Sequence, residues 1–169
     1  MIKRIILFFT FIFSIGCSSI INKSEITLPK NEKYAISSFW NYTDTTMAGL
    51  RASSIVEGVL SQQGIKLYSL IETDNESENI KNRENFISKE KSKAKNLGAS
   101  YLITGDVQEW RYKTGIDGEP VVSYTLKIID LKTNQTVFNA VGAKSGWGHK
   151  SIGVIAQEIA VSIIPKFVQ

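Results

Sequence analysis

Few residues in the chain combine a reactive side chain with a spacing that would support catalysis or metal binding. The single cysteine, Cys17, has no partner for an intramolecular disulfide bond, and the single histidine, His149, has no metal-ligand partner at a suitable spacing. Asp106 and Glu109 could form an acid/base pair, but alternation along one predicted strand places residues three apart on opposite faces. The sequence has no glycine-rich phosphate loop, Gly-x-Ser-x-Gly elbow or pair of histidines. We therefore expect no enzyme, no metal and no cofactor, with His149 exposed in a turn.

The setting of Cys17 points instead to modification. Lys3 and Arg4 precede an apolar run, residues 5–15, of about 11 residues, which is well short of the ~20 that a membrane-spanning helix needs. Residues 1–16 therefore read as a secretory signal peptide, with a membrane anchor as the alternative. The stretch Ser14-Ile15-Gly16-Cys17 resembles the lipobox of bacterial lipoproteins, with Ser14 in place of the usual leucine. The resemblance implies lipidation of Cys17 with palmitate-type acyl chains and, because no aspartate follows, sorting to the outer membrane. An ordinary secreted protein with an unmodified cysteine is the other alternative.

Trp147 is the second residue with an unusual setting, because it stands between two glycines in KSGWGHKS, residues 144–151. A tryptophan usually fills a core, so Trp147 could cap one end of the core beside the last strand. Tryptophan also favours the membrane interface, where its ring is apolar and its N–H stays hydrated. A lipid on Cys17 would hold the domain near such an interface, and we expect Trp147 to face the membrane.

The charge of the chain excludes some partners. The chain has 20 basic and 16 acidic residues, and without Lys3 and Arg4 the basic residues number 20 − 2 = 18, only slightly more than the acidic ones. No basic stripe with interleaved aromatic residues occurs. We expect no nucleic-acid binding. The acidic stretch around Glu72, Asp74, Glu76 and Glu78 could attract a cationic polymer or form a solvated loop.

The elements that would position these residues form a single domain, residues 34–169, preceded by a lipidated tether, residues 17–33. Apolar periodicity predicts the order β-α-β-α-β-β-β-α, an α+β domain with a mixed sheet and helices packed on it. The predicted strands cover residues 34–40, 65–71, 99–110, 121–131 and 136–146. The predicted helices begin at Asp44 or Thr45 and end at Gly64, run from Lys81 to Leu97, and run from Ser151 to Val168. On the last helix Val154, Val161 and Val168 recur every seven residues away from the apolar face, which fits either a subunit interface or scattered surface valines.

Two segments carry a resemblance to known families. LGASYLITGDV (residues 97–107) and SYTLKIIDLKTNQTVFNA (residues 123–140) resemble a group that includes the lipoproteins CsgG and LpoB and the amino-terminal domain of TolB. The ending AVGAKSGWGHKSIGVIAQEIAVSIIP resembles the PelC family of outer-membrane lipoproteins, which serve Pel exopolysaccharide export in biofilm formation. This second resemblance implies a lipid-anchored homo-oligomeric ring, dodecameric in the family, on the periplasmic side of the outer membrane. It also implies a secreted polysaccharide and an outer-membrane β-barrel exporter as partners, and a membrane-facing Trp147.

Two other functions stay open at this stage. One is an LpoB-like regulator of a peptidoglycan synthase, which would need a long tether to cross the periplasm. A tether of roughly 16 residues reaches at most about 55 Å when fully extended, which favours action close to the membrane. The other is a monomeric ligand-binding lipoprotein, for which the sequence reveals no polar pocket.

Overall fold

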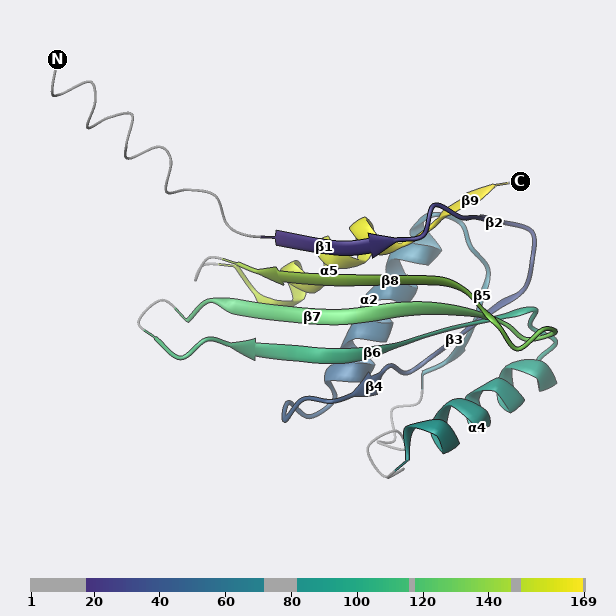
Figure 1. Cartoon of the computed structure of the whole chain (residues 1–169), viewed down its shortest axis with the longest axis horizontal. Helices are drawn as coiled ribbons and strands as arrows, with labels where there is room; N and C mark the ends of the chain where they lie inside the picture. The colour runs from purple at the N-terminus through teal and green to yellow at the C-terminus, as the bar shows by residue number, and fades with distance from the viewer. Residues whose placement is uncertain (1–17, 72–81, 116–117, 147–149, 169) are drawn as a thin grey trace, which may run out of the picture.

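The computed structural model describes residues 18–71, 82–115, 118–146 and 150–168. Within these ranges three helices pack on a mixed sheet, which confirms the predicted α+β class (Figure 1). The helices are α2 (Ala48–Gln62), α4 (Arg83–Asn96) and α5 (Ile152–Ile163). The strands are β1 (Ser18–Lys23), β2 (Thr27–Pro29), β3 (Tyr34–Ser37), β4 (Trp40–Asn41), β5 (Leu67–Leu70), β6 (Tyr101–Tyr112), β7 (Pro120–Asp130), β8 (Thr136–Ser145) and β9 (Lys166–Val168).

The main sheet has the order β1-β8-β7-β6-β3-β5, with β4 paired beside β6. The pairs β1–β8, β8–β7 and β7–β6 are antiparallel, whereas β3 lies parallel to both β6 and β5. The strands β2 and β9 form a separate parallel pair, which places residues 27–29 beside residues 166–168. The hydroxyl of Tyr34 donates to the carbonyl oxygen of Pro29 at 2.7 Å, and its ring meets the ring of Phe167 edge-on, so this small pair is fixed to the main sheet.

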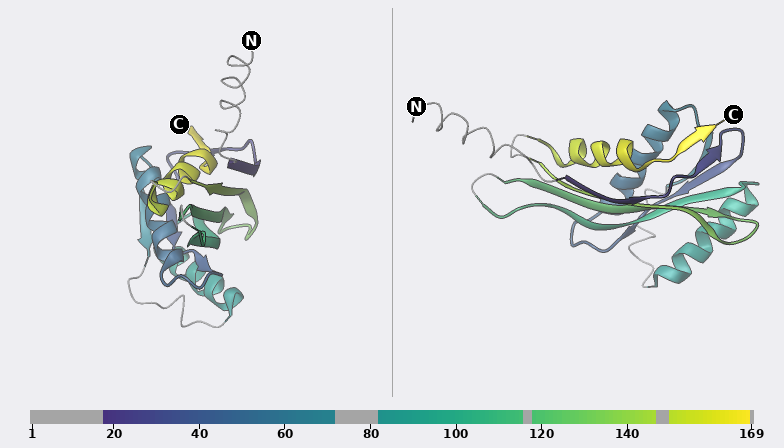
Figure 2. Two further views of the ribbon diagram at one scale, coloured as in Figure 1. Left: turned by 90° about the vertical axis from the view of Figure 1, so that its left-hand side faces the viewer. Right: turned by 45° about the horizontal axis from the view of Figure 1, so that its top comes forward.

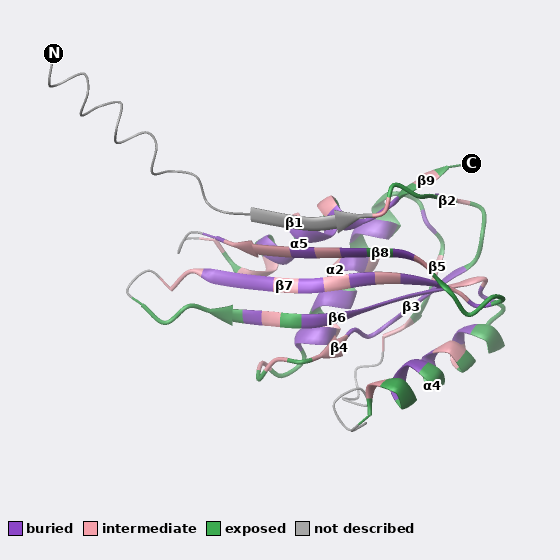
Figure 3. Ribbon diagram, viewed as in Figure 1, coloured by how far each residue is buried: buried purple, intermediate pink, exposed green. Residues whose placement is uncertain are grey.

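The helices α2 and α5 cover one face of the sheet and enclose the main core (Figure 2). In the sequence of β7 apolar and polar residues alternate from Val122 to Ile128, and Val122, Tyr124, Leu126 and Ile128 are all fully buried against this layer. The predicted apolar faces are confirmed for most of their residues, with Ala52, Val56 and Leu60 of α2 and Ile155, Ile159 and Ile163 of α5 buried (Figure 3).

The helix α4 packs on the other face of the sheet, at the end where β3, β5 and β6 begin. Neighbouring residues of β6 point to the two layers, since Ile103 lies in the main core and Leu102 packs with Ala94 of α4. A short apolar cluster of Phe86, Ile87 and Ile129 holds the first turns of α4 against the sheet. The rest of this face has no helix over it among the described residues.

Two short strands lie within residues 17–33, the segment predicted as a tether. Residues 18–23 form the edge strand β1, which pairs with β8, and residues 27–29 form β2. Polar sequences such as SSIINK form strands when a neighbouring strand supplies the hydrogen-bond partners, which sequence periodicity does not reveal. The body of the protein therefore begins immediately after Cys17.

The structure also corrects three helix ends. The helix α2 begins at Ala48, after Met47 in a left-handed conformation with φ 62°, because the Thr45 hydroxyl donates to the Trp110 carbonyl oxygen at 2.6 Å instead of capping the helix. The last helix ends at Ile163, because Pro165 lacks the N–H that would continue it, and Val168 lies in β9. The helix α4 ends at Asn96, and Leu97 is exposed rather than part of an apolar stripe.

Candidate functional site

Both predicted site residues lie outside the described residues, Cys17 just before β1 and Trp147 between β8 and α5. His149 and the acidic stretch from Glu72 to Glu78 lie outside them as well. The positions of Cys17 and Trp147 can therefore be discussed only through the described residues next to them in the chain.

Those flanking residues meet at one end of the sheet. In the antiparallel pairing of β1 with β8, Ser18 lies opposite Lys144, and Gly146 follows two residues after Lys144. The Gly146 N–H donates to the carbonyl oxygen of Pro120 at 2.9 Å, so the start of β7 lies here too. We call this region the Gly146 end. It brings the chain positions next to Cys17 and next to Trp147 to the same edge of the molecule.

Gly142 in β8 and Gly146 just after it lie so close to α5 that only glycine fits at these positions. A Cβ on Gly142 would lie 2.3 Å from Cγ2 of Ile159, and a Cβ on Gly146 would lie 2.6 Å from Cδ1 of Ile155. A glycine next to Trp147 gives the backbone freedom to bend. The contact with Ile155 shows that the missing side chain of Gly146 also allows α5 to pack closely against this segment.

Ion pairs fix the segments on both sides of Trp147 to α5. Glu158 of α5 forms ion pairs with Lys144 of β8 at 2.8 Å and with Lys150 at 2.9 Å. These contacts with two lysines lower the pKa of the Glu158 carboxyl below its ordinary value. Ser151 caps the helix, with its hydroxyl oxygen accepting from the Val154 N–H at 3.3 Å. The described residues on both sides of Trp147 are thus fixed to α5, an arrangement that could not be predicted from the sequence.

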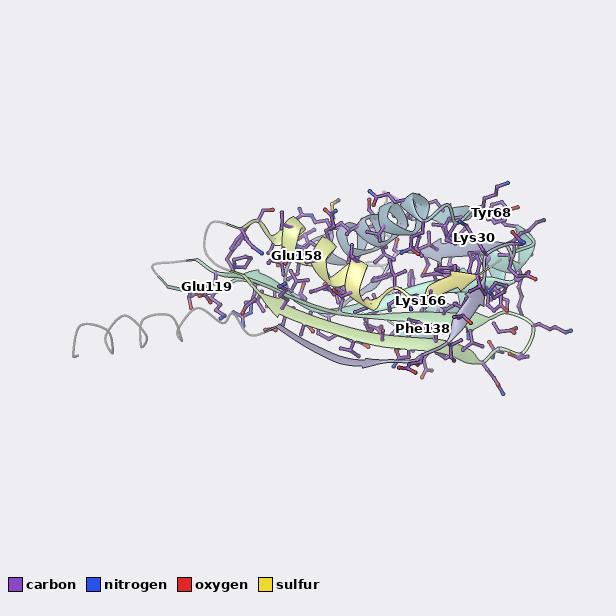
Figure 4. The ribbon with its side chains drawn as sticks, turned by 90° about the horizontal axis from the view of Figure 1, so that it is seen from above. Lys30, Tyr68, Glu119, Phe138, Glu158 and Lys166 are labelled. Carbon is purple, nitrogen blue, oxygen red and sulfur yellow. The ribbon has the colours of Figure 1, made fainter. Side chains whose placement is uncertain are left out.

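The described surface near this end is rich in polar and aromatic groups. Tyr112, at the end of β6, is 52% exposed, and the Ile152 N–H donates to its hydroxyl oxygen at 3.4 Å. Lys113 and Glu119 pair across the β6–β7 hairpin at 2.7 Å. Among the labelled side chains, Glu119 and Glu158 lie toward the Gly146 end, and Lys30, Tyr68 and Lys166 lie toward the opposite end (Figure 4).

A buried polar cluster lies on the sheet face that α4 partly covers. Asp106 of β6 is 4% exposed, and its carboxylate accepts from Arg83 of α4 at 2.5 and 2.9 Å, from Lys127 of β7 at 2.9 Å and from the Thr125 hydroxyl at 3.2 Å. Burial alone would raise the pKa of Asp106, but the hydrogen bonds from Arg83 and Lys127 outweigh it and lower the pKa. The cluster joins α4 to the centre of the sheet. We interpret it as structural, because the carboxylate is fully engaged.

The prediction that Asp106 and Glu109 lie on opposite faces is wrong. A β-bulge at Gln108 shifts the register, so that Asp106 lies opposite Thr125 and Glu109 lies opposite Ser123, two positions away on the same strand. The bulge therefore puts both carboxylates on one face. They have separate partners, since Glu109 pairs with Arg111 at the surface.

No group of three or more cysteine, histidine or carboxylate residues that could hold a metal ion occurs within the described ranges. In the same part of the chain, none of the helices has the length and apolar character needed to span a membrane.

Comparisons with known proteins agree with this geometry. No family model and no curated protein matches the chain. Among solved structures, two PelC dodecamers from Paraburkholderia phytofirmans, one of them a point variant, share 31% and 30% identity with it. They cover 88% of this chain and 95% and 94% of their own, with TM-scores of 0.70 and 0.69.

The lipoprotein GNA1162 from Neisseria meningitidis has a similar fold at lower identity. It shares 11% identity, covers 78% of this chain and 95% of its own, and has a TM-score of 0.60. At this identity the likeness concerns the fold alone.

Proposed function

The chain belongs to the PelC family, and from that membership we propose that it is a non-enzymatic outer-membrane lipoprotein of Pel-like exopolysaccharide export. In this proposal lipidated copies form a homo-oligomeric ring on the periplasmic side of the outer membrane. The ring helps guide the secreted polysaccharide through the periplasm to an outer-membrane channel. The observation that carries the proposal is the 31% identity to a PelC dodecamer across nearly the full length of both chains.

The Gly146 end suits the membrane-facing role proposed for it. Ser18 follows Cys17 directly and pairs opposite Lys144, three residues before Trp147. A lipid on Cys17 and an outward Trp147 would therefore reach the same membrane leaflet. Acyl chains and a tryptophan indole at the membrane interface would each contribute to membrane binding. A second contribution of this kind turns reversible membrane binding into firm binding.

The short connection between Cys17 and the sheet supports action at the membrane. With signal-peptide cleavage after residue 16 and β1 beginning at Ser18, no flexible tether separates the lipid from the folded domain. A regulator that contacts a peptidoglycan synthase across the periplasm needs such a tether. This favours the export ring over the regulator.

The proposal is tested in a bacterium that carries the matching export genes. Deleting the gene for this chain should abolish polymer secretion, the unsubstituted gene should restore it, and Cys17→Ser should not. Native mass measurement of the lipoprotein extracted in detergent should give a closed oligomer. A strictly monomeric protein, together with normal secretion in the deletion strain, would refute the proposal.

A further inference from the structure

An apolar groove opens on the helix-covered side of the sheet, between the start of α2, the end of β5 and the start of α5. It has a volume of about 620 Å³. Its apolar lining consists of Met47, Leu50, Ile55, Ile71, Ile152 and Trp110. Trp110 is 2% exposed, and its indole N–H has no acceptor among the residues that the structure describes. The groove is therefore an apolar surface with one unpaired donor in its wall.

A ridge of apolar side chains lies on α5. Val154 and Val161 are 43% and 59% exposed, and Gln157 lies on the same side of the helix between them. These residues adjoin Lys144 of β8, on the flank of α5 that faces away from α2. The seven-residue spacing of the two valines is a feature of the sequence, and neither valine belongs to the hydrophobic core.

The groove and the ridge lie on opposite flanks of the helix layer. Figure 2 shows α2 and α5 together on one face of the sheet. The groove is lined by the start of α2 and by Ile71 and Trp110, whereas the ridge adjoins Lys144 of β8. Gly153, which lines the groove, directly precedes Val154 of the ridge. The Val154 end of the ridge therefore lies beside the groove along α5, and the Val161 end lies about two helical turns further on.

We propose that the Val154–Val161 ridge of one copy packs into the α2–α5 groove of the next copy around the ring. This inference rests on the proposed function. A ring of identical subunits joins two different patches of each subunit, and it closes without becoming a filament only if those patches lie at one height. The groove and the ridge are two different patches, and the Val154 end of the ridge lies level with the groove along α5. They also meet the compositional condition of a subunit interface, an apolar centre with polar groups such as Arg51 and Ser54 at its rim.

The test is cross-linking in the outer membrane with the full lipoprotein. Ser54→Cys places a thiol at the groove, and Gln157→Cys places one on the ridge, both at exposed polar positions. A short bismaleimide should link a chain carrying both substitutions into a ladder that extends toward twelve copies. Two singly substituted chains, expressed together, should give dimers only, and each alone should give none.

Matched controls define the alternatives. Ser88→Cys replaces Ser54→Cys with an exposed serine of α4, on the other face of the sheet, and should not cross-link to Gln157→Cys. The unsubstituted chain, treated in parallel, reports any reaction through Cys17. Cross-linking of Ser54→Cys or Gln157→Cys to itself would indicate a two-fold interface and overturn the inference.

Failure of this inference can be separated from failure of the proposed function. An oligomer of unchanged mass, with no link between Ser54→Cys and Gln157→Cys, overturns the interface and leaves the export ring standing. A monomer in the membrane overturns both.

Discussion

Replacing Asp106 by Asn should destabilise the protein substantially, because it removes the one negative charge between Arg83 and Lys127. Removing one partner of a buried ion pair costs about 3–5 kcal/mol when the remaining charge stays buried. Here the side chains of Arg83 and Lys127 are 29% and 30% exposed, so water can solvate part of each cation. The asparagine also keeps the volume and one acceptor oxygen. We therefore expect a loss of about 2 kcal/mol, which corresponds to a melting temperature lower by roughly 4–8 °C.

Glu109→Gln is the matched control for Asp106→Asn. Both residues lie on β6 and face the same side of the sheet, and both carboxylates pair with an arginine. The Glu109–Arg111 pair is exposed, with side-chain exposures of 41% and 56%, so its loss should cost less than about 1 kcal/mol. Comparing the two variants separates the effect of burial from that of charge removal.

The contribution of Asp106 should also depend on pH in a definite direction. Its pKa in the folded protein is lowered from the ordinary value of 3.8. A lowered folded-state pKa means that the stabilisation is complete above the unfolded-state pKa and is lost as the pH falls through the folded-state value. The stability difference between the wild type and Asp106→Asn should therefore be full at neutral pH and shrink below about pH 4.

The assay is urea unfolding of the purified lipoprotein, followed by circular dichroism at neutral and acidic pH. Equal losses for Asp106→Asn and Glu109→Gln would refute the argument that burial makes this cluster stabilising. A difference that stays constant into acid would show that the charge of Asp106 is not its source.

Three further predictions concern anchoring and packing. Cys17→Ala should leave an uncleaved precursor outside the outer membrane, and mature protein in outer-membrane fractions would contradict lipidation. Trp147→Ala should barely change the melting temperature but weaken liposome binding. Trp110→Ala, which empties a buried site, should instead lower the free energy of unfolding by about 3–5 kcal/mol. A large stability loss for Trp147→Ala without a change in liposome binding would assign that ring to the core. Gly142→Ala should destabilise by about 1–3 kcal/mol, because the new methyl group would meet Ile159 of α5, and an unchanged urea midpoint would show that the helix can move aside.

Sequence periodicity predicted those helices and strands that bury one face and expose the other. The alternation from Val122 to Ile128 and the apolar face of α2 are properties of a single segment, so they can be recognised without knowing the neighbours. The end of α5 also left a signal, because the residue before Pro165 is restricted to extended conformations, and Ile164 adopts one.

Features that depend on a neighbouring segment could not be predicted in the same way. The strand β1 exists because β8 offers it a free edge, and SSIINK has no apolar alternation of its own. The Asp106 cluster depends on the bulge at Gln108 and on the register of β7, which bring Lys127 to the carboxylate. Asp106 within the apolar run LITGDV was the one available clue, since a lone carboxylate in a buried strand needs a partner.

The pairing of β1 with β8 has a mechanical consequence for an anchored protein. Its register runs from Ser18 opposite Lys144 to Lys23 opposite Ala140, and the hydrogen bonds of an antiparallel pair lie perpendicular to the strands. A pull that enters the chain at Cys17 acts along β1, so it loads these bonds in shear and they must rupture together. Peeling, in which bonds break one at a time at low force, would require a pull at right angles to the strand. If Cys17 carries the lipid and the chain serves polymer export, as proposed above, the folded domain should resist detachment from its anchor while the polymer moves past it.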